Sequence, residues 1–260
     1  MRYSNTVFTL ALASASIVHA QTYTDCNPTN KTCPADTGLD QWTFTTDFTK
    51  GQSALDKNWT AADGTTITFD DTKGAAFNIS ADGSAPTIST DFYIFFGLVE
   101  VVMQAAPGAG IISSVVLESD DLDEIDWEWL GGNDTTVESN YFGKGNTTSY
   151  DRAIYHDVTS PTTKMHTYTI EWTEQAITWS IDGTVVRTLK YSAANNGIDF
   201  PQTPLRIKLG NWCGGCSSEG EGTIEWAGGP TNFDDAPYIM YVESVKVCDC
   251  SKCAKYDRSY

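Results

Sequence analysis

The sequence predicts an all-β protein built as an antiparallel β-sandwich of two large sheets. Short runs in which apolar and polar residues alternate recur along the chain at the spacing typical of sandwiches. Helical periodicity is almost absent, so most of these runs are expected to be strands. The chain of 260 residues is also rich in aromatic side chains, with 8 Trp, 12 Tyr and 11 Phe. Aromatic residues favour strands and form surfaces on which carbohydrates stack.

The expected strands follow one another along the chain with clear turns between several of them. A turn containing Pro and Gly is expected at 106–110. Asp182-Gly183 is a strong two-residue hairpin signal between two runs of strand pattern. The runs with a strand pattern are 65–69, 97–104, 111–117, 166–172, 177–181, 184–187, 205–209 and 239–247.

The first 20 residues have the three parts of a secretory signal peptide. Arg2 is the basic residue, residues 7–18 form a short apolar run, and Val18-His19-Ala20 places a small residue at the cleavage point. The apolar run is too short to span a membrane. A buried N-terminal helix fits these features less well. We therefore expect residues 1–20 to be a signal peptide and residues 21–260 to form one domain.

The charge of the chain excludes some classes of partner. It has 16 Lys and Arg against 34 Asp and Glu, a net charge of −18. So acidic a protein is a poor candidate for binding nucleic acid or an anionic membrane surface. Most of this charge is expected to be a solvated surface. We expect a monomer with no obligate protein partner.

Sequons and cysteines point to a secreted glycoprotein in an oxidising compartment. Cys26 and Cys33 enclose a short loop and are expected to pair. Cys213-Gly-Gly-Cys216 is read as a disulfide rather than half of a zinc site or a redox motif, because no second such motif or His pair accompanies it. The 7 cysteines leave one unpaired. The sequons, some of which can arise by chance in a Thr-rich chain, are at Asn30, Asn58, Asn78, Asn133 and Asn146.

The most informative segment is 123–131, which reads DEIDWEWLG. Successive side chains of a strand point to opposite faces, so Glu124, Asp126 and Glu128 share one face. The other face carries Ile125, Trp127 and Trp129, which are expected to pack in the core. Three like charges on one strand face are destabilising unless something uses them.

Cleavage of a glycosidic bond is the use that fits these carboxylates best. Glu124 and Glu128 are about 13 Å apart at Cα in an extended strand, and their side chains can reach toward each other. A retaining glycosidase needs two carboxyl groups about 5–5.5 Å apart, one as nucleophile and one as proton donor. Asp126 lies between them, and its charge helps to keep the donor protonated. Calcium binding, a solvated face and a lectin-like remnant are the alternatives; calcium sites usually lie in turns.

Several other residues are candidates for sugar contacts. In 205–212 a period of two places Lys208, Gly210 and Trp212 on one face, with Lys208 able to bond hydroxyl or acetamido groups and Trp212 able to stack on a ring. Core packing is the alternative for a lone Trp. Residues 223–226 are expected to alternate in the same way, and 140–142 to pair with the carboxylate strand. The further candidates are Thr223, Trp226, Tyr141 and, as a weaker one, Arg152.

Other aromatic and histidine residues are expected to be structural. Trp172 and Trp179 alternate within apolar hairpin strands, which predicts core packing. His156 and His166 show no partner pattern of a metal site, and His166 opens a strand. We expect no metal and no cofactor.

The segment 123–131 resembles the Glu-X-Asp-X-Glu signature of glycoside hydrolase family 16. Further stretches fall in the order of that family over roughly 44–248. A single residue between Asp126 and Glu128 resembles plant xyloglucan endotransglycosylases, whereas many bacterial laminarinases carry an extra residue there. The signal peptide, the Cys26–Cys33 start, the Asp-Trp-Glu-Trp form and the 213–216 loop resemble fungal Crh-type cell-wall transglycosylases. The other matching stretches are 97–100, 111–117, 166–172, 181–183 and 211–212.

The resemblance implies a fold, a reaction and a role for each carboxylate. The fold would be a jelly-roll of the concanavalin A type, with a concave cleft for substrate. Glu124 would be the nucleophile, Asp126 the assisting carboxylate and Glu128 the acid/base. The concave sheet would hold a chitin donor, whose cut end is joined to β-glucan or chitin. The implied chitin contacts are Lys208, Trp212 and Thr223.

The chain departs from many such relatives in two respects. It ends at Tyr260 without a Ser/Thr-rich stretch or an apolar anchor signal, and it has no Cys-dense chitin-binding module. We therefore expect a soluble form in the cell wall, or a trimmed catalytic domain whose missing tail carries a glycosylphosphatidylinositol anchor.

Two other functions compete with the transglycosylase interpretation. One is an endo-acting hydrolase of β-glucan or chitin, which uses the same carboxylates with water as acceptor. The other is a non-catalytic wall lectin, which has no need of an intact triplet. A structural wall protein would show repeats or low complexity, and neither is present.

Overall fold

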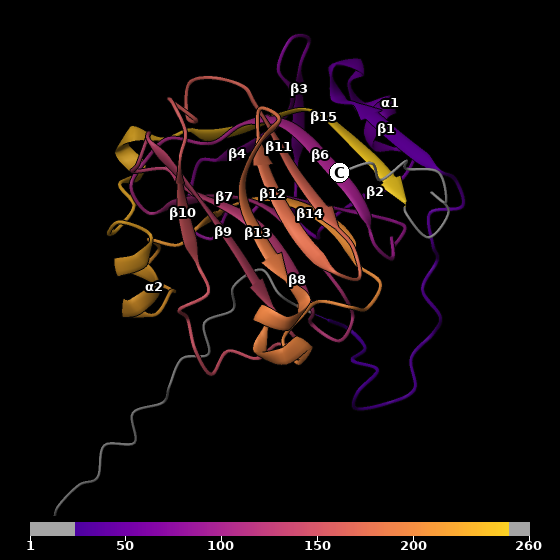
Figure 1. The fold of residues 1–260 in the computed structure, drawn as a ribbon. Helices are drawn as coiled ribbons and strands as arrows, with labels where there is room; N and C mark the ends of the chain where they lie inside the picture. The colour runs from indigo at the N-terminus through magenta and orange to yellow at the C-terminus, as the bar shows by residue number, and fades with distance from the viewer. Residues whose placement is uncertain (1–23, 250–260) are drawn as a thin grey trace, which may run out of the picture.

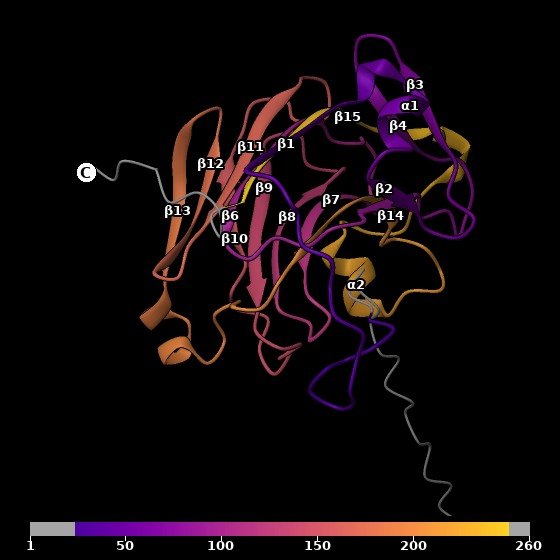
Figure 2. The ribbon, with the colours of Figure 1, turned by 90° about the vertical axis from the view of Figure 1, so that its right-hand side faces the viewer.

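The computed structural model describes residues 24–249, which form two antiparallel β-sheets lying against each other (Figures 1 and 2). The signal peptide expected at 1–20 and the cysteines at 250 and 253 lie outside the described residues. The all-β sandwich expected from the alternating patterns is confirmed.

The larger sheet has eight strands. Its strands are β1 Thr43–Asp47, β3 Ile67–Asp70, β4 Gly74–Ile79, β6 Gly97–Gln104, β11 His166–Trp172, β12 Ala176–Ile181, β13 Thr184–Lys190 and β15 Tyr238–Asp249. Their order is β13-β12-β11-β6-β15-β4-β3, and β1 pairs with β15.

The second sheet has seven strands and carries the carboxylate segment. Its strands are β2 Trp59–Ala61, β5 Thr87–Thr90, β7 Ile111–Glu118, β8 Glu124–Leu130, β9 Thr136–Phe142, β10 Ile154–Asp157 and β14 Arg206–Cys213. Their order is β10-β9-β8-β7-β14-β5-β2. The carboxylate strand β8 therefore lies inside the sheet, between β9 and β7.

The eight runs with a strand pattern are all present as strands, with ends that differ by a few residues. Asp182 and Gly183 join β12 and β13 with φ of 49° and 78°. Positive φ at both residues is what the expected two-residue hairpin turn requires. The patterns did not predict β1, β2, β4, β5 and β10, most of which are short.

Helices are few and short in the part of the chain that the structure describes. The α-helices are α1 Gln52–Leu55 and α2 Glu221–Trp226, and the 3-10 helices are η1 Phe48–Lys50, η2 Tyr191–Ala193, η3 Asn195–Gly197 and η4 Phe233–Asp235. None of the helices in residues 24–249 is long and apolar enough to cross a lipid bilayer.

The core between the sheets is rich in large aromatic side chains. Trp127 and Trp129 of β8 meet Tyr168 of β11 edge to face, with ring centroids 5.7 and 4.6 Å away. Such pairs stabilise beyond the area they bury. Trp172 and Trp179 are fully buried, as expected, and the indole Nε1 of Trp179 donates to the Asp126 carbonyl oxygen at 3.1 Å. The core thus holds the backbone of the carboxylate strand from behind.

Candidate active site

The three carboxylates of β8 lie on the face of the seven-stranded sheet that points away from the other sheet. Their cross-strand neighbours on β9 are Phe142, Asn140 and Glu138. Ile125, Trp127 and Trp129 are buried in the core on the opposite face, as the alternation predicted. We call the side with Glu124, Asp126 and Glu128 the carboxylate face.

β8 is a regular strand through the whole triplet. Its pairing with β7 runs without interruption from Leu130 opposite Ile112 to Glu124 opposite Glu118. A bulge would turn one of the carboxylates away from the other two. The unbroken register therefore keeps all three on one face.

The triplet holds protons more tightly than ordinary carboxyl groups do. Burial is the largest cause: it raises the pKa of Glu124 and Glu128 well above their usual value and that of Asp126 to about 8. Repulsion between neighbouring carboxylates adds to these pKa shifts, with Asp126 acting on both glutamates. A carboxyl group with a raised pKa is suited to donate a proton near neutral pH.

Within the triplet, Asp126 forms a hydrogen bond with Glu124 and none with Glu128. Its carboxylate shares a hydrogen bond with Glu124 and accepts another from the backbone N–H of Asn140. Its Oδ1 is buried and has no partner in residues 24–249. Glu128 instead faces the indole N–H of Trp212, which opposes the rise of its pKa. The two glutamates therefore have different surroundings, as two different roles require.

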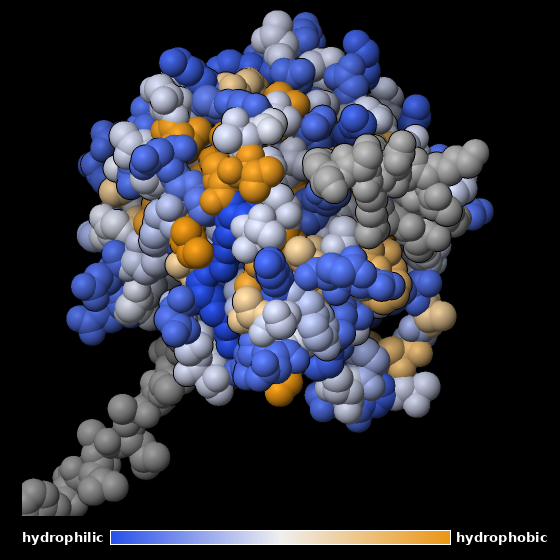
Figure 3. Space-filling view, in the orientation of Figure 1, coloured by the Kyte–Doolittle hydropathy of each residue, from blue (hydrophilic) through white to orange (hydrophobic). Residues whose placement is uncertain are grey.

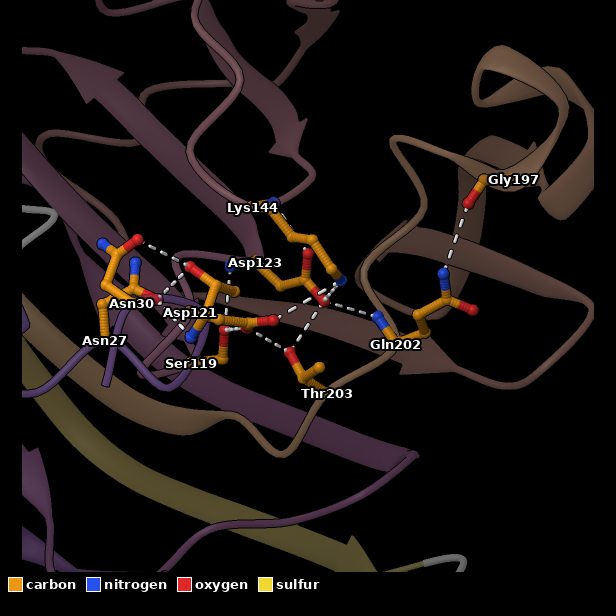
Figure 4. A network of polar contacts seen from close by, with 10 residues as sticks. Asn27, Asn30, Ser119, Asp121, Asp123, Lys144, Gly197, Gln202 and Thr203 are labelled. Carbon is orange, nitrogen blue, oxygen red and sulfur yellow. Dashed lines mark hydrogen bonds and ion pairs between the residues drawn. The ribbon is translucent and has the colours of Figure 1, made fainter. Parts of the chain in front are cut away.

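A buried polar network fixes the chain where it enters β8 (Figure 4). Asp123, which is 0% exposed, accepts from the backbone N–H groups of Lys144 at 2.9 Å and Gln202 at 2.8 Å. It also accepts from Oγ1 of Thr203 at 2.7 Å. The same Thr203 hydroxyl lies 2.6 Å from Asp121. Three loops are thereby joined beside the first residue of the triplet.

β14 brings Lys208 and Trp212 to the carboxylate face, as the alternation predicted. They lie opposite Val116 and Ile112 of β7. Both are only 6% exposed, and the ammonium of Lys208 forms an ion pair with Glu118. Lys208 is therefore committed to a buried carboxylate, and its contact with chitin stays a prediction.

Residues 221–226 form α2, so the expectation of an extended alternation at 223–226 is wrong. Two periods of alternation are too few to separate a strand from a helical turn. The helix ends because Gly228 and Gly229 adopt φ of 90° and 110°, which residues with a side chain rarely adopt. Thr223 is buried in this helix, and its chitin contact stays a prediction. The ring of Trp226 stacks on Trp212, with centroids 6.0 Å apart and planes at 25°.

Tyr141 and Arg152 are placed away from the carboxylates. Tyr141 lies opposite Ile125 and is part of the core, because its odd position in β9 turns it to the inner face. This placement corrects the interpretation of Tyr141 as a residue that stacks on sugar. Arg152 pairs with Asp199 at 3.5 Å and lies over the rings of Tyr141 and Phe142. Its role in sugar binding stays a prediction.

Two acidic residues of the carboxylate face were missed at the sequence level. Glu118 ends β7 opposite Glu124, and Glu138 of β9 lies opposite Glu128. Both are buried, at 1% and 2% exposure. The alternation Glu138-Ser139-Asn140 was the available signal, since it places Glu138 and Asn140 on one face of a strand next to β8.

Both expected disulfides, Cys26–Cys33 and Cys213–Cys216, are present. The second closes the loop between β14 and α2, beside Trp212. Within residues 24–249, no three His, Cys, Asp or Glu side chains are grouped so that they could hold a metal ion. The expected structural role of His166 fits its contacts with Asp182 at 2.7 Å and the carbonyl of Thr159 at 2.9 Å.

A surface groove of about 680 Å³ lies elsewhere, between the β8–β9 turn and the β10–β11 loop on one side and the β12–β13 hairpin on the other. Asp134, Asp157, His166 and Asp182 are among its lining residues, and none of the triplet is. Figure 3 shows this side of the molecule, which is largely hydrophilic with scattered apolar spots, some of them over β10 and β13. We assign the chemistry to the carboxylate face, because the proton-holding groups are there.

A family model and several curated proteins match this chain. The family model described as glycosyl hydrolases family 16 matches residues 48–228. Crh-like protein 5 of Aspergillus fumigatus is 53% identical over 259 residues, which is 100% of this chain and 64% of that protein. Crh-like protein 2 of Botryotinia fuckeliana is 52% identical over 95% of this chain and 55% of its own length. The chain thus spans less than two thirds of these two curated relatives.

Solved structures show the same fold. A structure described as Crh5 transglycosylase in complex with NAG has a TM-score of 0.83 and 57% identity, over 86% of this chain and 90% of that one. A Bacillus licheniformis β-glucanase has a TM-score of 0.66 and 22% identity, over 81% of this chain and 99% of its own. The second likeness concerns the fold alone.

Proposed function

Because the chain belongs to glycosyl hydrolase family 16, we propose that it is a retaining transglycosylase of the fungal cell wall. It cleaves β-1,4-linked chitin and transfers the new end to β-glucan or chitin chains. The observation that carries this proposal is the carboxylate triplet on one face of β8, in which Glu124 and Asp126 are buried, Glu128 is partly buried and all three pKa values are raised. The likeness to a transglycosylase described in complex with NAG supports the choice of donor sugar.

In the first step the glycosidic bond of the donor is broken. The Glu124 carboxylate attacks the anomeric carbon, and a C–O bond to the enzyme forms as the bond to the leaving oxygen breaks. Glu128 gives its proton to that oxygen. The rise in the pKa of Glu128, caused mainly by burial, keeps this proton available.

In the second step the glycosyl group leaves the enzyme. Glu128, now ionised, removes a proton from a hydroxyl of the incoming sugar chain. The hydroxyl oxygen attacks the anomeric carbon, and the bond to Glu124 breaks. When water takes the place of the sugar hydroxyl, the same step is hydrolysis.

Asp126 assists by holding a proton between itself and Glu124. A hydrogen bond joins the two carboxyl groups, so one of them must be protonated. When Asp126 carries the proton, Glu124 is ionised and can act as nucleophile. Burial raises the pKa of both carboxyl groups, that of Asp126 to about 8, so the pair keeps a proton at neutral pH.

The test is an assay for hybrid products. The protein is incubated with chitin oligomers and fluorescently labelled laminarin oligomers, and products are separated by size and identified by mass. We expect labelled products that contain N-acetylglucosamine units. If only shortened chitin appears, the transferase function is lost and a hydrolase remains.

The Glu124→Gln variant separates either enzyme from a lectin. It should bind chitin oligomers and form no hybrid product. A wild-type protein that binds chitin but neither shortens nor transfers it would be a lectin.

A further inference from the structure

We propose that Glu138 of β9 is a positioning residue, which holds Trp226 against the carboxylate face and so sets how tightly a chitin chain binds beside Glu128. The choice of chitin rests on the function proposed above. The positioning itself rests on the contacts of Glu138.

Glu138 lies in the same row of the sheet as Glu128. β9 places it directly opposite Glu128, and β10 places Tyr155 on its other side. Side chains in directly opposed positions have Cβ atoms about 4.5–5.5 Å apart. Although Glu138 points away from the core, it is only 2% exposed, because Trp226 of α2 reaches over it.

The hydrogen-bond donors around Glu138 in the described chain are uncharged. Nε1 of Trp226 donates to Oε2 at 3.1 Å, and Nδ2 of Asn140 lies 3.5 Å from Oε1. The hydroxyl of Tyr155 also bonds this carboxylate. Two directly opposed acidic residues repel each other, so Glu138 costs stability beside Glu128. A carboxylate in return holds an indole N–H more firmly than a neutral acceptor does.

α2 depends on such contacts for its place. It has six residues, which is too few for a helix to be stable alone. The apolar cluster under it is small and consists of Ile112, Trp212 and Ala227, with Leu130 and Trp226 packed against them. Stacking on Trp212 fixes the height of the Trp226 ring above the sheet, and the bond to Glu138 fixes its rotation. Removal of Glu138 therefore frees the ring.

The surface that results suits a pyranose ring. Trp226 is partly exposed, whereas Trp212 beneath it is buried. A rigid aromatic face next to polar groups is typical of sites that bind one end of a ligand by stacking and orient it by hydrogen bonds. Because Glu128 lies next in the same row, a sugar on Trp226 is close to the bond that is cut.

The test measures chitin binding without turnover. Each variant is made in the Glu124→Gln background, and the dissociation constant of a chitin oligomer is measured by calorimetry. Glu138→Ala should weaken binding about tenfold, the effect of one hydrogen bond to a charged group. Glu138→Gln keeps an acceptor and should weaken it less than threefold. Glu225→Ala, which removes an exposed carboxylate one residue from Trp226, is the matched control and should change nothing.

A double-mutant cycle tests whether Glu138 acts through Trp226. Trp226→Phe keeps a ring and removes the donor, so Glu138→Ala added to it should weaken binding by no more than about twofold. Quenching of tryptophan fluorescence by acrylamide should rise in Glu138→Ala alone, since the freed ring becomes more exposed. If Glu138→Ala does not fold, Trp226→Phe still reports the loss of the bond.

The outcomes separate this proposal from the proposed function. The positioning role is overturned if Glu138→Ala binds chitin as tightly as its parent. It is also overturned if Glu138→Ala weakens binding as much in the Trp226→Phe background as it does alone. Both conclusions hold even if the wild type makes hybrid products. A wild type without hybrid products whose binding depends on Glu138 as described overturns only the transferase. A parent protein that binds no chitin overturns both.

Discussion

Lys208 of β14 and Glu118 of β7 form an ion pair on the carboxylate face, with side chains 8% and 1% exposed. Glu118 lies in the same row of the sheet as Glu124, and Lys208 lies in the row of Asp126, because Val116 is opposite both Lys208 and Asp126. Burial lowers the pKa of the Lys208 ammonium, and the nearby Asp25 carboxylate opposes this shift. The ammonium thus balances part of a row of negative charges and is not directed only at substrate.

Loss of Lys208 should therefore destabilise the protein. Lys208→Met leaves Glu118 buried and without its ion pair, and removal of one partner of a buried pair costs about 3–5 kcal/mol. The double variant Glu118→Gln/Lys208→Met should recover most of this loss. Guanidinium unfolding of the three proteins measures both effects. A Lys208→Met protein that keeps its stability and loses only chitin binding would instead support the sugar contact predicted from the sequence.

On the carboxylate face, the sequence predicts which face a side chain is on but not which partner it contacts. Alternation alone assigned Glu124, Asp126, Glu128, Lys208 and Trp212 to their faces, because the period of two is a local property of a strand. The partner of Lys208 was not predictable, since Glu118 is 90 residues away in the chain and meets it only through the register of β7 and β14. Register depends on the packing of the whole sheet.

The predictions that were wrong or incomplete failed because the outcome depends on residues outside the segment concerned. Tyr141 was expected beside the sugar because it is aromatic, yet its position opposite Ile125 turns it inward. Residues 223–226 have a strand-like alternation, but the glycines that follow end a helix there. Glu138 escaped notice because its significance depends on Trp226, which comes from an element far along the chain.

The acid/base role of Glu128 predicts a dependence on the leaving group. Glu128→Ala should lower transfer from chitin oligomers by about 10²–10⁴, the usual contribution of a positioned proton donor. Aryl chitobiosides with acidic phenols need no proton to leave, so their rate of phenol release should fall far less. Spectrophotometric assays of both substrates make the comparison. Equal losses on both would assign Glu128 another role.

The nucleophile should behave differently. Glu124→Gln removes the attacking carboxylate and should abolish release of phenol from either kind of substrate, because no glycosyl-enzyme forms. Mass spectrometry of the wild type with a slow fluorosugar substrate should show the added glycosyl mass on a peptide containing Glu124. Label on a peptide that lacks this residue would contradict the assignment.

The triplet should make the protein less stable as the pH rises. The pKa of Asp126 is raised from about 3.9 in an unfolded chain to about 8, so between these values the folded state binds a proton that the unfolded state has released. Its contribution is complete below pH 4 and is lost as the pH rises through 8, by at most about 1.4 kcal/mol per pH unit. The Asn side chain of the Asp126→Asn variant does not titrate, so this variant lacks the contribution of Asp126 to the pH dependence.

Unfolding of the wild type and Asp126→Asn between pH 4 and pH 8 checks this sign. The variant should gain stability relative to the wild type as the pH rises. The general repulsion caused by the net charge of −18 affects both proteins, so its effect cancels in the difference between their unfolding free energies. A difference that stays constant with pH would show that Asp126 is ionised throughout.

The network at the start of β8 should position Glu124. Asp123 accepts from Lys144, Gln202 and Thr203, so Asp123→Ala leaves the backbone N–H groups of Lys144 and Gln202 without this acceptor, whereas the Thr203 hydroxyl keeps Asp121 (Figure 4). Each of these two lost bonds to a charged group costs about 1.5–3 kcal/mol, and the loops that they hold should loosen. Because Glu124 is the next residue, kcat should fall at least tenfold while KM for chitin oligomers changes little. Asp71→Ala, which removes an exposed carboxylate in a turn, should alter neither. A variant that loses stability but keeps kcat would show that the network supports the fold and not the nucleophile.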